Sequence, residues 1–328
     1  MRAAVVGAGF VGSIHARALR DHPSVDLVAV CGRTAPKTEG LAATFGAAAR
    51  GSVEELMQKD APDLVCVCTG NDQHVEPTLE SLEDGAHVFV EKPMAFRLDQ
   101  ARKMVATADS QGRTLGVNFN HRFSEPYRRA VRFAADGGLG SVCYLDMKFA
   151  GDLYKELNNP YCMLIETQGH SLDLFRLFGG EIATVSAHFA DPRGIGIFTS
   201  AALSVTFSGG AVGTLLGSWD GSYGDPGAQV LEVAGLDGRI VVEDVVGSVR
   251  LFTESSQLFS EWRPGMFDSR ARDFWRTIDV HVHAFVDSIL EGRDPPVTGR
   301  DGVRALELTF AAIDSFEHGR AIDTKSAM

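Results

Sequence analysis

The sequence predicts an α/β protein in two parts: a doubly wound parallel sheet in residues 1–120, and an α+β domain in residues 121–328 with a large, mainly antiparallel, open sheet. Two observations predict this fold class. Short apolar runs alternate with helical patterns in the first part, as in sheets that carry helices on both faces. After Arg122, apolar runs separated by tight-turn sequences are typical of antiparallel strands. A length of 328 residues also suits two domains.

In the first part, apolar runs predict parallel strands that are buried on both faces. These runs are residues 3–6, 27–31, 64–69, 88–90 and 115–118. Helices are predicted after Gly12, over residues 78–83 and over residues 98–109. The first helix has an apolar face, because Ile14, Ala18 and Leu19 recur at helical spacing.

Residues 121–328 are predicted to form mainly strands, with a few helices. Strands are predicted over residues 142–149, 184–189, 201–207, 212–219, 229–234, 240–243 and 249–253. Helices are predicted over residues 127–135, 168–178, 280–290 and 302–318. Ser208-Gly209-Gly210 and Leu236-Asp237-Gly238 fit hairpin turns, so the strands on either side of each should pair antiparallel.

The first strand runs directly into a glycine-rich turn and then a helix. Gly7-x-Gly9-x-x-Gly12 in this setting is the dinucleotide fingerprint of a Rossmann domain. The first glycine allows the tight turn, the second lets backbone approach a pyrophosphate, and the third lets helix and strand pack closely. Free N–H groups at the helix start, where Phe10 and Val11 lie, favour the phosphates. The alternative is a glycine-rich turn in another kind of α/β protein.

The end of the second strand predicts which dinucleotide binds. Sites that prefer NAD place an acidic residue there, to accept a hydrogen bond from the ribose 2′-hydroxyl. This chain has Gly32, Arg33 and Thr34 instead. Glycine removes the repulsion of a 2′-phosphate, and arginine can donate two hydrogen bonds to it. We therefore expect NADP(H) to be preferred over NAD(H), unless Arg33 is only a solvated loop residue.

Composition excludes several classes of partner. The net charge of −12 argues against nucleic acid and against an anionic membrane surface, and no apolar stretch approaches transmembrane length. The N-terminus leaves no room for a secretory signal.

The five cysteines have no zinc-site spacing and suit a reduced, cytoplasmic setting. Among them Cys162 is interpreted as a bystander rather than a nucleophile.

Lys92 is the first candidate for chemistry. It follows a short buried strand at the sheet edge where a dinucleotide should lie, and Pro93 fixes the local turn. A partly desolvated lysine there can exchange a proton with a substrate oxygen. The alternative is an ion pair with Glu91, although alternation along a strand would put the two side chains on opposite sides.

Glu166, His170 and Asp173 form the second candidate cluster. Their spacings of four and three place all three on one face of a helix. A carboxylate on either side of an imidazole holds its orientation and raises its pKa, which suits proton transfer. A satisfied core histidine is the alternative. One histidine and two carboxylates make a poor metal site, so we expect none.

These motifs together resemble the Gfo/Idh/MocA oxidoreductases, the group of glucose–fructose oxidoreductase and inositol dehydrogenase. The resemblance spans essentially the whole chain, and four motifs carry it: Gly7-x-Gly9-x-x-Gly12, Asn71-x-x-His74, Glu91-Lys92-Pro93 and His170-x-x-Asp173. It implies a catalytic role for Lys92 and proton transfer by His170. Asn71 and His74 fall on the family's cofactor-side loop, and we expect the cofactor-binding residues there to be Thr69, Asn71, His74, Glu91 and Lys92.

The family further implies homodimers or homotetramers formed through the open sheet, and substrates that are sugars, inositols or related polyols. This chain departs from the family pattern at Gly70, Glu166 and Gln168, where Pro, Asp and Gly are common. The aromatic residues that could stack on a sugar are Tyr154, Tyr161, Trp219 and Tyr223.

The sequence therefore predicts an NAD(P)-dependent dehydrogenase or ketoreductase. Lys92 and His170 would share proton transfer, while Glu166 and Asp173 orient the imidazole or hold neighbouring hydroxyls. Two rivals stay open. One is a glycoside-cleaving enzyme of the same family that holds its NAD tightly. The other is a regulator without activity that senses the dinucleotide.

Overall fold

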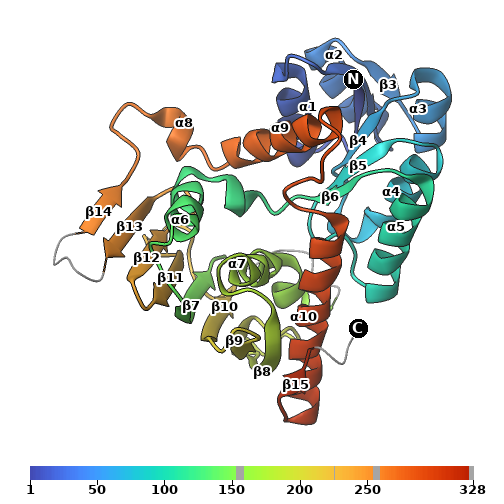
Figure 1. The fold of residues 1–328 in the computed structure, drawn as a ribbon. Helices are drawn as coiled ribbons and strands as arrows, with labels where there is room; N and C mark the ends of the chain where they lie inside the picture. Colours follow the sequence, from blue (N-terminus) through green and yellow to red (C-terminus); the bar gives the residue numbers. More distant parts are fainter. Residues whose placement is uncertain (153–158, 225, 254–258, 325–328) are drawn as a thin grey trace. The chain divides into compact units, whose positions relative to one another are not determined.

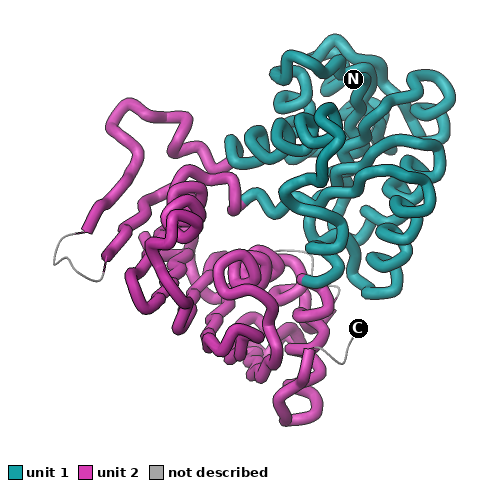
Figure 2. Tube along the Cα trace, viewed as in Figure 1, with its two compact units in different colours: residues 1–120, 275–304 teal, residues 121–274, 305–328 magenta. Residues whose placement is uncertain are grey.

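The computed structural model describes residues 1–152, 159–224, 226–253 and 259–324 (Figure 1), so Tyr154 lies outside the described residues. The chain divides into two compact units (Figure 2). Unit 1 consists of residues 1–120 and 275–304, and unit 2 consists of residues 121–274 and 305–328. The sequence prediction assigned all of 121–328 to one domain. Residues 275–304 instead belong with unit 1, because helix α9 (Arg276–Leu290) packs against helix α1 (Phe10–Asp21).

The sheet of unit 1 is wholly parallel, in the order β3-β2-β1-β4-β5-β6. Its strands are β1 (Arg2–Val6), β2 (Asp26–Cys31), β3 (Ala48–Arg50), β4 (Leu64–Val67), β5 (His87–Val90) and β6 (Leu115–Val117). The doubly wound fold class is confirmed. The strand order reverses between β1 and β4, and ligands of such sheets bind beyond the carboxyl ends of the strands at that point.

Alternate side chains of these strands face two helical layers. Ala3 and Val5 of β1 join a buried cluster with residues of α1 and α9. The other face carries α4 (Val75–Glu83) and α5 (Leu98–Gln111), which pack on each other (Figure 1). The sequence analysis did not predict three short elements of this unit: α2 (Ala35–Phe45), β3 and α3 (Val53–Asp60). β3 has only three residues, all half-buried, so it gives no apolar run to detect.

Unit 2 contains a sheet in the order β14-β13-β12-β11-β7-β10-β9-β8-β15. Its strands are β7 (Val142–Ala150), β8 (Ile182–Ala190), β9 (Ser200–Phe207), β10 (Val212–Ser218), β11 (Gln229–Gly235), β12 (Gly238–Glu243), β13 (Ser248–Thr253), β14 (Phe259–Trp262) and β15 (Ile322–Asp323). Both predicted hairpins are confirmed, because β9 pairs antiparallel with β10, and β11 with β12. β7 and β10 form a parallel pair within this mainly antiparallel sheet.

One face of this sheet is covered by helices. α7 (Gly169–Gly179) packs on β7 and β8, and α6 (Glu125–Ala135) packs on β12 and β13 (Figure 1). Residues of β7, β9 and β10 alternate between buried and exposed, so the opposite face is solvent-accessible. The remaining helical segments are η1 (Asn71–Gln73), η2 (Asn120–Phe123), the π-helix η3 (Met163–Thr167), α8 (Ser269–Arg272) and α10 (Gly299–His318).

Candidate active site

The glycine turn between β1 and α1 has the geometry that a dinucleotide requires. Gly7 has φ of +118°, and a Cβ atom on it would lie 2.3 Å from the Cys68 carbonyl oxygen. A Cβ atom on Gly12 would lie 1.8 Å from the Gly7 carbonyl oxygen. Around Gly9 a Cβ atom would meet no atom of the described residues within 4 Å. Packing therefore requires glycine at positions 7 and 12. Gly9 instead leaves open space beside the N-terminus of α1, where a pyrophosphate can bind.

Phe10 and Val11 begin helix α1. The Phe10 side chain is 63% exposed, and its ring meets that of Trp275 edge to face with the centroids 4.8 Å apart. Trp275 precedes α9 and was not among the predicted site residues. A single sequence gives no signal that would bring a residue 265 positions away to this turn.

The loop after β2 holds the residues predicted to select the cofactor. A Cβ atom on Gly32 would lie 2.7 Å from the Thr38 hydroxyl oxygen, so this glycine has a packing reason of its own. Arg33 is exposed, and its guanidinium donates a 2.6 Å hydrogen bond to the side-chain oxygen of Gln73 in η1. Thr34 is the N-cap residue of α2. Of these three residues, Arg33 is the one whose side chain can bind a 2′-phosphate through charge.

The loop after β4 is held in place by hydrogen bonds to other groups of the protein. The Thr69 hydroxyl donates to the Gln73 carbonyl oxygen at 2.8 Å, and Asn71 begins η1. His74 is fully buried, and its ring nitrogens face the carbonyl oxygens of Pro93 at 2.8 Å and Thr69 at 3.2 Å. Burial lowers the pKa of His74. These contacts favour a supporting role for His74, which ties the cofactor-side loop to the segment after β5, over direct contact with a ligand.

Glu91, directly after β5, lies in a buried polar network. Its carboxylate accepts hydrogen bonds from His15 of α1 at 2.7 Å and from the Asn118 amide at 2.6 Å. The Asn118 side-chain oxygen lies 3.0 Å from Nδ1 of His281 on α9. Burial raises the pKa of Glu91, but the hydrogen bonds from His15 and Asn118 outweigh it, so the pKa is lowered overall. Glu91 was predicted among the cofactor-binding residues, and its hydrogen bonds join the end of β5 to α1 and to Asn118, which in turn contacts α9.

Lys92 follows Glu91 at the same sheet edge as the glycine turn, and it is half-buried. The peptide bond from Lys92 to Pro93 is cis. Glu91 is hydrogen-bonded to His15 and Asn118, and the charge of the neighbouring Lys92 helps to lower the pKa of Glu91.

In unit 2, the structure adds Arg122 to the predicted cluster of acids and histidine. Glu166 lies in the π-helical turn η3, while His170 and Asp173 lie on α7, and all three are buried. Arg122 binds both oxygens of the Asp173 carboxylate, with Nε 2.6 Å from Oδ2. Asp173 was predicted to orient the imidazole. The structure also gives it a guanidinium partner, so that its carboxylate ties η2 to α7.

A second histidine lies against the predicted one. The rings of His121 and His170 stack at 3.8 Å with an angle of 6° between their planes. Nδ1 of His121 is 3.1 Å from the side-chain nitrogen of Gln229. The side-chain oxygen of Gln229 accepts a hydrogen bond from the Tyr127 hydroxyl at 3.2 Å. His121 was not among the predicted site residues, although Asn118-x-x-His121-Arg122 directly after a predicted strand was a signal that could have singled it out.

The structure also places four other residues that the sequence singled out, namely Gln168, Cys162, Trp219 and Tyr223. Gln168 replaces the glycine common in the family, and its amide donates to the Phe149 carbonyl oxygen at 3.1 Å. Gly217 makes room for it, since a Cβ atom there would lie 2.6 Å from the Gln168 amide carbon. Burial raises the pKa of the Cys162 thiol to about 11, which favours the bystander interpretation. Trp219 is buried and donates to the Thr167 hydroxyl, whereas Tyr223 is 52% exposed.

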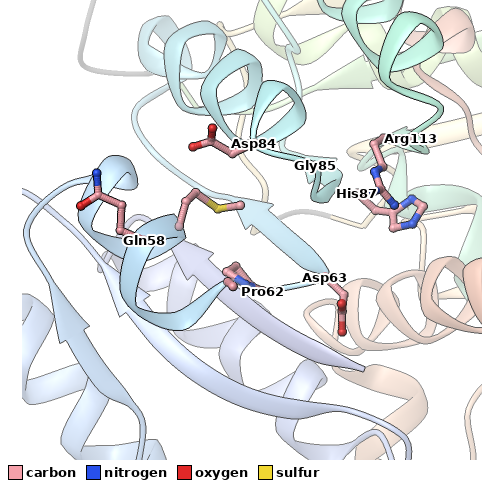
Figure 3. Close-up of a pocket in the computed structure, with 9 residues that line it drawn as sticks. Gln58, Pro62, Asp63, Asp84, Gly85, His87 and Arg113 are labelled. Atoms are coloured by element: carbon pink, nitrogen blue, oxygen red, sulfur yellow. The ribbon is translucent and has the colours of Figure 1, made fainter.

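A cavity of about 410 Å³ in unit 1 lies away from these residues (Figure 3). It opens at the beginnings of β4 and β5, the edge opposite the glycine turn, and Asp63, His87 and Arg113 are among its polar lining. The residues that line it include none of the predicted site residues.

The described residues contain neither a candidate metal site nor a membrane-spanning helix. No group of three or more His, Cys, Asp and Glu side chains there could hold a metal ion. Likewise, none of the helices in the described parts of the chain has the length and apolar character needed to span a membrane.

Comparison with known proteins agrees with the two-part fold. Residues 1–119 match the model described as "Oxidoreductase family, NAD-binding Rossmann fold" of the Gfo/Idh/MocA group, and residues 127–241 match the model of the Gfo/Idh/MocA C-terminal domain. The chain belongs to the Gfo/Idh/MocA oxidoreductase family. The predicted resemblance and the predicted enzyme class, an NAD(P)-dependent dehydrogenase, are confirmed.

Two inositol dehydrogenases match this Gfo/Idh/MocA protein over almost its entire length, and a third relative matches less than half of it. Myo-inositol 2-dehydrogenase of Thermotoga maritima is 25% identical over 334 residues, which cover 98% of each chain. Inositol 2-dehydrogenase of Rhizobium meliloti is 25% identical over 338 residues, again 98% of each chain. D-glucoside 3-dehydrogenase of Escherichia coli is 35% identical over 144 residues, 43% of this chain and 41% of that protein.

Solved structures share the fold. An oxidoreductase from Agrobacterium radiobacter in complex with NAD⁺, L-tartaric acid and magnesium superposes with a TM-score of 0.88 at 19% identity, covering 100% of this chain and 99% of the other. Levoglucosan dehydrogenase in complex with NADH and levoglucosan has a TM-score of 0.87 at 18% identity, with 99% of both chains covered.

Proposed function

We propose that this enzyme transfers a hydride between NADP(H) and a CH–OH carbon of a sugar, an inositol or a related polyol. The observation that carries the proposal is the placement of Lys92 at the same sheet edge as an open dinucleotide turn, in a chain that also buries His170 beside a second imidazole. The names of the full-length relatives, which are inositol dehydrogenases, support the substrate class.

In this proposal the protein's own residues handle the proton. In the oxidative direction the substrate C–H bond breaks as a hydride, and the bound nicotinamide supplies the carbon that accepts it. His170 takes the hydroxyl proton, Lys92 holds the same oxygen by charge, and the oxygen becomes a carbonyl. Glu166 holds neighbouring hydroxyl groups. In reduction the proton returns from His170 to the oxygen.

The first test is Lys92→Ala, with Lys103→Ala on helix α5 as the matched control. We expect Lys92→Ala to lose ~10²–10⁴-fold in kcat while it still binds the dinucleotide, because general acid–base groups contribute at that scale. The assay follows nicotinamide absorbance over a panel of inositols, aldoses and keto-sugars. Near-normal turnover in Lys92→Ala would contradict the proposed role of Lys92 at the reacting oxygen.

The same assay separates the two rival functions. Product without a net change of absorbance would favour the glycoside-cleaving enzyme, and no turnover of any polyol would favour the regulator without activity.

The preference for NADP(H) rests on Arg33, which is exposed and held by Gln73 beside the end of β2. A guanidinium there can bind a 2′-phosphate through two charge-assisted hydrogen bonds. We expect Arg33→Ala to weaken NADPH binding by about tenfold or more, as the loss of such contacts costs ~1.5–3 kcal/mol, and to leave NADH binding nearly unchanged. Tighter binding of NADH than NADPH to the unmodified enzyme, measured by fluorescence titration, would overturn the preference.

We further propose a cytoplasmic homodimer or homotetramer that forms through the exposed face of the unit 2 sheet. Apolar side chains on that face support this, since Tyr144 is 40%, Val212 54% and Leu216 48% exposed in one copy of the chain. Exposed apolar side chains that cluster on one face are typical of association surfaces.

A further inference from the structure

We propose that His121 is a positioning residue that stabilises the protonated form of His170, and that Gln229 fixes the tautomer of His121 on which this depends. The inference deepens the proposed function, because it rests on His170 as the group that takes the substrate proton.

The first step is the geometry of the two rings. They lie parallel, 3.8 Å apart, with 2% of the His121 side chain and 5% of the His170 side chain exposed. The rings of Phe149 and Phe274 meet His121 edge to face at 5.8 Å and 5.6 Å. The shared face is therefore dry, and each ring feels the charge of the other without the screening of bulk water.

The second step is the protonation state of His121. The Tyr127 hydroxyl donates to the side-chain oxygen of Gln229. The side-chain nitrogen of Gln229 faces His121, where its N–H donates to Nδ1. A proton on Nδ1 would put two donors against each other. His121 therefore carries its proton on Nε2 and is neutral.

The third step concerns energy. A neutral aromatic face attracts a cation that lies on it, whereas two imidazolium rings at 3.8 Å would repel strongly. When His170 takes the hydroxyl proton it becomes an imidazolium, and the neutral ring of His121 stabilises that state. His121 thus raises the basicity of His170 without touching the substrate.

Other charged groups near the pair do not change in the variants below. Within the described part of unit 2 they are Glu166, one helical turn before His170, and the ion pair of Arg122 with Asp173. A shift in the titration of His170 between variants therefore reports on residues 121 and 229.

The test is an NMR titration of the His170 ring in ¹³C-histidine-labelled enzyme, assigned with His170→Asn. In Gln229→Glu the new carboxylate accepts a proton from Nδ1, His121 becomes charged, and we expect the proton affinity of His170 to fall by about tenfold or more. His121→Leu removes the ring face and should lower the affinity by several-fold, whereas His121→Phe keeps a neutral ring and should preserve it within about threefold. His188→Phe, on the exposed part of β8, is the control.

The acidic limb of the kcat–pH profile should move to lower pH in Gln229→Glu and His121→Leu, in parallel with the ring titration. An unchanged proton affinity of His170 in both variants would overturn the inference, even if kcat falls, since a merely structural role predicts that result. His170→Asn with normal turnover would instead refute the proposed function. The ring titration is independent of turnover, so the two failures are distinguishable.

Discussion

Glu91 carries a largely buried carboxylate, with 12% of its side chain exposed, and its charge is stabilised by its immediate neighbours. His15 and Asn118 bond to the same carboxylate oxygen, and their hydrogen bonds overcome the cost of burial, so the pKa of Glu91 is lowered. A carboxyl group whose pKa is lower in the folded state stabilises that state at every pH above its unfolded pKa, ~4.3. The contribution disappears as the pH falls through the lowered, folded pKa.

Glu91→Gln should therefore lower the free energy of unfolding at pH 7 by about 1–3 kcal/mol, because a neutral amide replaces a charged acceptor that buried donors require. Urea unfolding at pH 7 and at about pH 3 measures the effect, and the difference from wild type should narrow at the lower pH. Glu83→Gln, at an exposed position on α4, is the control. Equal stability of Glu91→Gln and wild type at pH 7 would show that the charge contributes nothing.

At the scale of elements, the glycines of the β1–α1 turn have different roles. Gly12 lies where backbone of the same turn leaves no room for a side chain, so it determines how closely the helix packs on the strand. Gly9 faces open space, and its small size matters only when a ligand approaches. One motif therefore contains a position that stability requires and a position that binding requires.

Alanine substitutions separate the two tasks. Gly12→Ala should destabilise unit 1 by about 1–3 kcal/mol, because its methyl group has no space without a backbone shift. Gly9→Ala should unfold like wild type in a thermal melt and bind NADPH at least about tenfold more weakly, since one lost contact of ~1.4 kcal/mol changes affinity by that factor. Normal dinucleotide affinity in Gly9→Ala would mean that the pyrophosphate does not approach this backbone.

At the scale of the whole molecule, the exposed face of the unit 2 sheet sets the expected assembly. Tyr144, Val212 and Leu216 lie on it beside polar residues such as Thr214, which donates a hydrogen bond to Asp146. A mixed surface of this kind can be covered by a second copy of the same face, with two-fold symmetry.

Leu216→Glu should convert the proposed oligomer into a monomer, because the new carboxylates would be buried close to their symmetry mates. Light scattering after size-exclusion chromatography measures the mass. Leu290→Glu, at a half-exposed position at the end of α9, controls for loss of an exposed leucine elsewhere. A wild-type protein that is monomeric at micromolar concentration would disprove the assembly, as would a Leu216→Glu variant of unchanged mass.

Much of the fold was predictable because local patterns specify it. The parallel strands of unit 1 are continuous apolar runs, and the glycine turn has a fixed spacing, so both were predicted within a few residues. The hairpins of unit 2 were equally visible from their turn sequences. By contrast, β3, β14 and β15 are short or exposed, and they are strands only because a neighbouring strand pairs with them.

The sequence by itself determined the fold class, the dinucleotide turn and the candidates Lys92 and His170, since each depends on residues that are close along the chain. Only the tertiary structure decided which side chains contact the residues of the candidate site. It joined Glu91 to His15, gave Asp173 to Arg122 and stacked His121 on His170. The physical reason is that burial, stacking and ion pairing depend on distances through space, and a single sequence does not encode those distances in its spacing.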